Sequence, residues 1–267
     1  MIRIHLPYLF ELAAALEPLE NLKQSRINDN YPLWRAESAL RQLLTNSVYS
    51  SELRNCVQQG NRLLELMNEQ IEKSAKNVDA EISFVDCRLI GLNYEQFKTV
   101  FVSEIGVWPS YFVNRKGGYD TLTLLDAGET LFPETLFQKV PEAIFDAREA
   151  SKALAFECCT AAGFHVYRCL ESVLRRYWKE VSGGSPDPKV RSIGVYVRAL
   201  EKGKFGDPKV VSALDQINNL HRNPLIHPEV ALNMNETIDS FGMVRSAIGA
   251  MLQALPDAPS TTYTPTP

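Results

Sequence analysis

Residues 160–183 read TAAGFHVYRCLESVLRRYWKEVSG and predict one long amphipathic helix. Thr160 is expected to cap its start, and the pair Gly183-Gly184 to end it. Apolar side chains recur at helical spacing on one face, and charged side chains gather on the other. The apolar stripe consists of Phe164, Val166, Leu170, Val173, Leu174 and Tyr177, and the charged face carries Arg168, Glu171, Arg175, Arg176 and Lys179.

The segments on both sides of this helix predict a self-contained helical bundle over residues 133–255. We expect its other helices at 142–154, 190–202, from Pro208 to Leu220, and from a cap at Asn235 to Leu255. The tail 256–267 is rich in proline and threonine and has nothing to bury, so it is expected to be disordered.

The N-terminal part divides into a helical region, 1–80, and a mixed insert, 81–132. The helical region shows periodicity at 9–26, 33–48 and 51–77, with Pro32 in a first turn and Ser50 or Ser51 as an N-cap. The insert contains a helix at 94–107, then β-formers at 111–113 and the turn pair Gly117-Gly118, which predict a short strand or hairpin. The predicted fold class is therefore mostly α, with a small irregular α/β insert and a C-terminal bundle.

Composition limits the function classes. The chain has 267 residues, a formal net charge of −4 and 45% hydrophobic residues, which describes a folded globular protein rather than a disordered one. It contains no apolar run of the roughly 18–20 residues that a membrane span needs, and we read no signal peptide, so a cytoplasmic protein without membrane contact is expected. Because the chain as a whole carries no excess of positive charge, any nucleic-acid contact would come from a local basic patch.

Cysteine and histidine usage gives no sign of a metal or cofactor site. The five cysteines form no CxxC pair, which argues against a disulfide scaffold and a zinc ribbon. We expect Cys158, Cys159 and Cys169 to be core residues, and His165 to be a satisfied core or interface histidine.

One further segment has the residue types for chemistry: LHRNPLIHPE, residues 220–229. Arg222 and His227 lie at the break between the last two helices. Pro224 disfavours a continuous helix here, because proline excludes the α conformation from the residue before it. The resulting turn can present Arg222 and His227 on a common surface.

The arrangement Arg222-Asn223-Pro224-Leu225-Ile226-His227 resembles the signature of HEPN domains, in which an Arg precedes a His by four to six positions. The helix 164–177 also resembles the HEPN helix that faces this motif. The similarity covers residues 140–255, under half of the chain. The chain also resembles a bacterial group of unclear role that shares these stretches and a helical N-terminal extension.

The resemblance implies a metal-independent endoribonuclease that serves in antiviral defence or in toxin–antitoxin growth arrest. Its partners would be RNA, a second copy of the chain bound through the C-terminal bundle, and an antitoxin or defence protein. His227 would take the proton from an RNA 2′-OH, Arg222 would hold the phosphate, and Asn223 would orient His227 or donate to the phosphate. The second copy would supply the general acid, and the products would be a 2′,3′-cyclic phosphate and a 5′-OH.

Substrate-binding candidates surround this motif. Arg168, Arg175 and Arg176 would form a phosphate-binding wall on the facing helix, and His221 could join it. Glu171 could pair with Arg168 within the helix, or orient the motif from across the bundle. The alternative for the whole motif is a stable corner between helices, within a non-catalytic dimeric HEPN module that binds a protein partner or a nucleotide.

Overall fold

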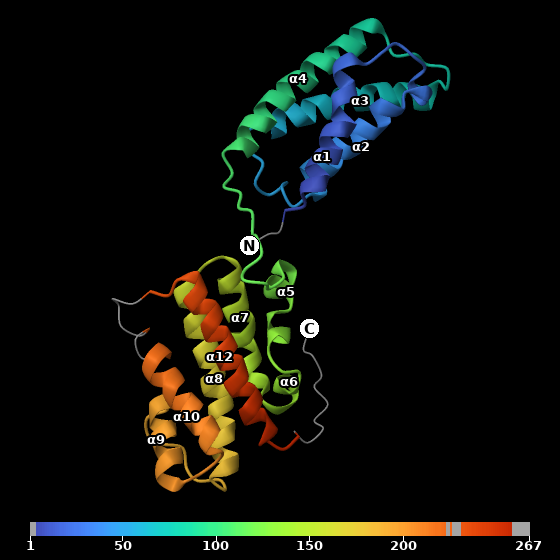
Figure 1. Cartoon of the computed structure of the whole chain (residues 1–267). Coiled ribbons are helices and arrows are strands. Elements are labelled where there is room, and N and C mark those ends of the chain that lie inside the picture. The colour runs from blue at the N-terminus through green and yellow to red at the C-terminus, as the bar shows by residue number, and fades with distance from the viewer. Residues whose placement is uncertain (1–3, 223–224, 226–230, 258–267) are drawn as a thin grey trace. The chain divides into compact units, whose positions relative to one another are not determined.

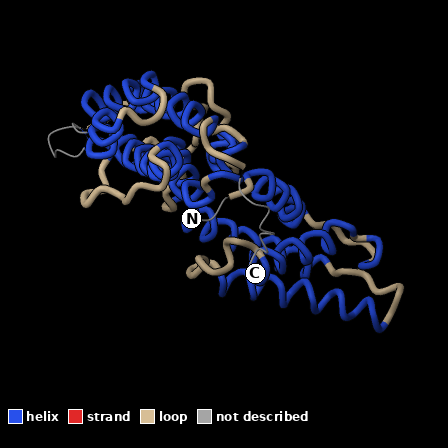
Figure 2. The backbone as a smooth tube through the Cα atoms, turned by 90° about the horizontal axis from the view of Figure 1, so that it is seen from below, coloured by secondary structure: helices blue, strands red, loops and turns tan. Residues whose placement is uncertain are grey.

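The computed structural model describes residues 4–222, 225 and 231–257. The chain divides into two compact units, Met1–Ser110 and Tyr111–Pro267. Throughout the described part, helices are joined by loops, and extended backbone pairs only as two isolated bridges, Arg26–Glu81 and Lys116–Tyr119 (Figure 2). None of the described helices is both long and apolar enough to cross a membrane.

The N-terminal unit is a bundle of four longer helices with two 3₁₀ turns. Its elements are α1 (Leu6–Leu16), η1 (Glu17–Asn21), η2 (Ile27–Asp29), α2 (Tyr31–Asn46), α3 (Val57–Lys76) and α4 (Phe84–Gly106). Along the chain, α1 packs on α2, α2 on α3 and α3 on α4. Pro32 lies in the first turn of α2 as predicted, next to a cap in which the Asn30 side chain accepts the Leu33 N–H.

Two predicted helices of this unit are shorter than their apolar periodicity suggests. The helix expected at 9–26 stops at Leu16, and a 3₁₀ turn with proline in its first positions follows. The helix expected at 51–77 begins at Val57, and residues 47–56 form turns before it. The prediction of Ser50 or Ser51 as its N-cap is therefore wrong, because the residue directly before the helix is Cys56.

The turn that leads into α3 is held by Glu104, which reaches across from the end of α4. Its carboxylate accepts the backbone N–H groups of Arg54, Asn55 and Cys56 at 2.5, 2.9 and 2.9 Å. Burial alone would raise the pKa of Glu104, but these three hydrogen bonds lower it to about 2. The buried carboxylate thus pairs the N–H groups of the turn up to Cys56, the residue directly before α3, and its negative charge also suits the positive end of the helix dipole.

We predict that Glu104→Gln weakens the N-terminal unit. A pKa of about 2, against 4.5 for an ordinary glutamate, corresponds to about 3 kcal/mol of stability. Because the pKa is lowered by folding, this stability is present above pH 4.5 and is lost as the pH falls toward 2. Amide exchange over residues 54–76 of the full chain should accelerate by about two orders of magnitude at neutral pH.

The control is Glu69→Gln, on the exposed face of α3. It makes the same chemical change without removing the contact with the turn before α3, so exchange should stay near the wild-type rate. Equal acceleration in both variants would contradict the stabilising role of Glu104.

The predicted α/β insert is wrong. Residues 84–106 form one long helix of the N-terminal unit, and residues 111–113 form a loop in which Tyr111 and Phe112 are 85% and 91% exposed. β-formers without a neighbouring extended segment have no ladder to join, which explains this outcome. The turn itself is confirmed, because Gly117 and Gly118 adopt φ values of +53° and +91°.

The C-terminal unit is organised around its longest helix, α8 (Cys159–Val181). The other elements are α5 (Thr121–Asp126), η3 (Gly128–Leu131), α6 (Thr135–Lys139), η4 (Pro141–Ala143), α7 (Ile144–Ala155), α9 (Ile193–Gly203), α10 (Pro208–Ile217), η5 (Asn218–Arg222) and α12 (Met234–Gln253). Helix α8 packs most extensively against α7 and α12 (Figure 1).

The apolar stripe of α8 is buried with one exception. Val166, Leu170, Val173, Leu174 and Tyr177 are at most 1% exposed, but Phe164 is 43% exposed. Among the cysteines expected in the core, Cys169 is buried, Cys159 is partly buried and Cys158 is exposed. The prediction fails for Cys158 because α8 begins only at Cys159, so Cys158 lies in the turn before the helix.

The helix ends of this unit agree with the prediction at one point and differ at two. Gly183 and Gly184, both with positive φ, end α8 as predicted and donate to the carbonyls of Glu180 and Lys179. Thr160 lies inside α8 rather than at its cap. The cap of α12 is Asn233 instead of Asn235, because Asn233 forms a reciprocal capping box with Glu236.

Candidate functional site

Arg222 ends a π-helical turn, η5, that directly follows α10. The turn contains two consecutive asparagines: Asn219 donates to the Asp215 carboxylate at 2.8 Å and accepts from buried Asn218 at 3.0 Å. Asn218 fits beside α9 because the neighbouring residue is Gly194, where a Cβ would lie 2.9 Å from the Asn218 amide nitrogen. π-Turns are rare and occur often at functional sites. Here the turn directs Arg222 toward α8.

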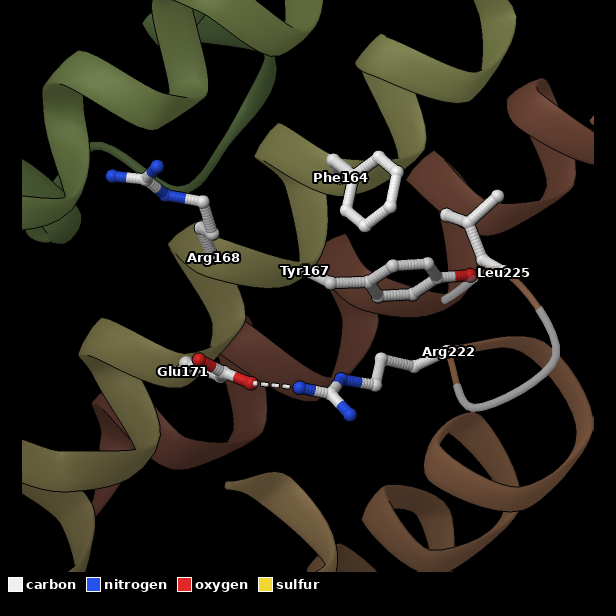
Figure 3. Close-up of a pocket in the computed structure, with 6 residues that line it drawn as sticks. All are labelled: Phe164, Tyr167, Arg168, Glu171, Arg222 and Leu225. Atoms are coloured by element: carbon white, nitrogen blue, oxygen red, sulfur yellow. Dashed lines mark hydrogen bonds and ion pairs between the residues drawn. The ribbon is translucent and has the colours of Figure 1, made fainter. Parts of the chain in front are cut away.

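Arg222 and Glu171 meet across the bundle (Figure 3). The Arg222 Nη2 donates to Glu171 Oε1 at 3.2 Å, and the two side chains are 22% and 17% exposed. Of the two contacts expected for Glu171, the structure therefore shows the one with the motif. Arg168, the other expected partner, pairs with a different carboxylate.

A pocket of about 70 Å³ lies at this contact. Its charged lining is Arg168, Glu171 and Arg222, and its apolar lining is Phe164, Tyr167 and Leu225 (Figure 3). The Tyr167 hydroxyl donates to Ser240 Oγ at 3.0 Å, and burial raises the pKa of this tyrosine. Tyr167 is therefore a fixed, neutral wall of the pocket.

Arg168 is positioned by Asp146 of α7. Its Nε lies 3.1 Å from Asp146 Oδ1, and His165 Nδ1 lies 2.8 Å from the same oxygen. The Asp146 side chain is only 8% exposed, so its charge requires such partners. His165 is partly buried and hydrogen-bonded, in agreement with its predicted structural role. Burial, with a smaller contribution from Asp146, raises the pKa of the Cys169 thiol to about 12.

The structure brings only some of the predicted site residues together. Arg168, Glu171 and Arg222 share the pocket, whereas Arg175 and Arg176 line a second pocket farther along α8. His221 lies in η5 and is partly exposed. Asn223 and His227, two of the three predicted catalytic residues, lie outside the described residues.

Sequence reasoning missed Asp146 and Tyr167. A signal for Asp146 was present, since His165 and Arg168 are three residues apart on one helix face and a nearby acid would be expected to serve both. The Tyr167–Ser240 contact joins residues that are 73 positions apart, and nothing in the local pattern predicts it.

No family model, no curated protein and no solved structure matches this chain. Within the described ranges, no group of three His, Cys, Asp or Glu side chains is arranged to hold a metal ion.

We predict that Asp146→Asn loosens the junction of α7 and α8. The amide keeps the shape but removes the charge that faces Arg168 and His165, and breaking such a contact at a buried carboxylate costs about 1–3 kcal/mol. Thermal unfolding of the full chain should shift to lower temperature, and amide exchange over residues 144–170 should accelerate.

A double-mutant cycle with Arg168→Gln tests the cause. If Arg168 is the partner that matters, the second substitution adds less to Asp146→Asn than it costs alone. Strict additivity of the two losses would show that Asp146 acts independently of Arg168.

Proposed function

We propose that the C-terminal unit is a metal-independent endoribonuclease of the HEPN type, with Arg222 and His227 as its reacting residues. The observation that carries this proposal is the contact of Arg222, the first residue of the RNPLIH motif, with Glu171 of α8. An arginine held by a carboxylate on a rigid helix is oriented before substrate arrives, and such preorganisation favours stabilisation of developing charge.

The proposed reaction is transesterification within the RNA strand. His227 takes the proton of the 2′-OH, and the 2′ oxygen bonds to phosphorus as the bond to the 5′ oxygen breaks. Arg222 stabilises the charge that builds on the phosphate oxygens. The leaving 5′ oxygen takes a proton from a second histidine, supplied by another copy of the chain. Asn223 orients His227 or donates to the phosphate.

Arg168 adds positive charge at the rim of the same pocket. Its side chain is 63% exposed although its Nε is held by Asp146. A guanidinium that is fixed at one edge and open to solvent can meet a neighbouring phosphate of the strand. It would position RNA without taking part in the reaction.

A specific observation supports a second candidate, the non-catalytic dimeric module that binds a protein partner or a nucleotide. Glu171 already balances the charge of Arg222, so a phosphate has to compete with a carboxylate for it. The pocket of about 70 Å³ is also far below the roughly 300 Å³ at which small-molecule sites begin.

We predict that the purified protein cleaves single-stranded RNA in EDTA and leaves 2′,3′-cyclic phosphate and 5′-OH ends. Arg222→Ala and His227→Ala should each lower the rate by about 100-fold or more, since each removes a group that acts on the transition state. The rate should be measured with a labelled oligonucleotide, and thermal unfolding should show that each variant folds.

The matched control is Arg198→Ala, an exposed arginine on α9 that lines neither pocket. It should cleave at the wild-type rate. Equal residual cleavage by wild type and both motif variants would identify a contaminating nuclease. Absence of cleavage by folded wild type would favour the binding module.

A further inference from the structure

A second pocket, of about 320 Å³, opens between α8, η4 and the loop that follows α8. Four cationic side chains and two acidic ones line it: Arg175, Arg176, Lys179, Arg191, Glu142 and Asp187. Ser172 completes the lining, so every residue around the space is polar. The four cations exceed the two acids by two charges, in a chain whose overall charge is negative.

The acids fix two of the arginines in place. Arg176 Nε donates to Glu142 at 2.8 Å, and this contact raises the pKa of Arg176. Arg191 Nη2 lies 3.5 Å from Oδ2 of Asp187, on the loop after α8. The two guanidinium groups are therefore held on different elements at the same opening, α8 and the segment before α9.

The other two cations lack full compensation. Arg175 Nη2 lies 4.0 Å from Glu171 Oε2, the longest distance of an ion pair. Within the described residues, the solvent-shielded Arg175 Nε has no hydrogen-bond acceptor. Among the described residues, no carboxylate lies within ion-pair distance of exposed Lys179. The lining thus contains two cations that no described carboxylate fully neutralises.

We propose that this pocket binds the phosphate groups of a nucleotide, either free or within a nucleic-acid strand. Arginine guanidinium groups match phosphate oxygens with paired donors, and a lysine adds a mobile point charge. The volume is at the lower end of the range for small-molecule sites and suits a phosphate group with part of its sugar. Ser172 offers a hydroxyl donor on the α8 side.

This site goes beyond the proposed endoribonuclease and does not depend on it. Its lining residues are all different from those of the pocket at Arg222. Glu171 nevertheless contacts Arg222 at 3.2 Å and approaches Arg175 at 4.0 Å, so the two sites are neighbours along one face of α8. Phosphate binding can be measured whether or not the chain cleaves RNA.

The experiment titrates the full chain with pyrophosphate at constant ionic strength and follows binding by calorimetry. Wild type is compared with Lys179→Gln combined with Arg191→Gln, which removes two cations from the pocket. The control combines Arg198→Gln with Lys202→Gln, two exposed cations on α9, and thus makes the same change in net charge. We expect binding to weaken about tenfold or more in the pocket variant, because it loses two cationic donors to phosphate oxygens, and to persist in the control.

A second titration uses a single-stranded deoxyoligonucleotide, which has no 2′-OH and cannot be cleaved by the proposed reaction. A parallel loss of its binding in the pocket variant would assign the site to a phosphate of a strand. Loss of pyrophosphate binding alone would assign it to a free nucleotide. Absence of pyrophosphate binding by wild type, or equal weakening in the pocket variant and the α9 control, would overturn the proposal.

Discussion

Helix α8 has a buried apolar face and a densely charged opposite face, and the C-terminal unit satisfies both. Burial between α7 and α12 fixes the rotation of the helix about its axis. Once that rotation is fixed, the charged side chains pair with groups on the elements that border them. Asp146 of α7 pairs with Arg168, and Glu142 of the turn before α7 pairs with Arg176. Arg222 of η5 pairs with Glu171. The partners of the charged face thus follow from packing on the apolar face.

The same constraint explains why the charged face forms two neighbouring pockets rather than one wall. Near its middle, Glu171 places a negative charge between Arg222 and Arg175. Toward the N-terminal side the cations are compensated by carboxylates and surround a small space. Toward the C-terminal side the loop after α8 adds Arg191, and the balance becomes positive. One acidic side chain therefore separates the site with the reactive motif from the site with the greater excess of charge.

In the N-terminal unit, a single buried carboxylate likewise pairs with groups on another element. Glu104 is 48–50 residues away from the backbone N–H groups that donate to it, so the turn before α3 is held by a contact with another helix. A local serine cap would hold α3 regardless of its neighbour, whereas the Glu104 contact forms only when α4 is in place. This contact makes the start of α3 part of the tertiary structure of the unit.

The sequence by itself determined the helical class, the long helix at 160–183, its buried stripe and its glycine stop, because periodicity and backbone freedom are local properties. It also indicated that Arg222 and Glu171 could meet across the bundle. Local patterns did not determine the start of α3 or the loop at 111–113. They also did not determine that Arg168 lines one pocket and that Arg175 and Arg176 line another. Those features depend on which partner is close in space: Glu104 for α3, a missing strand neighbour for the loop, and Asp146, Glu171 and Glu142 for the three arginines. Tertiary structure decided them because the partner of a charge, a helix end or a strand edge is a group that lies close in space, and folding determines which group that is.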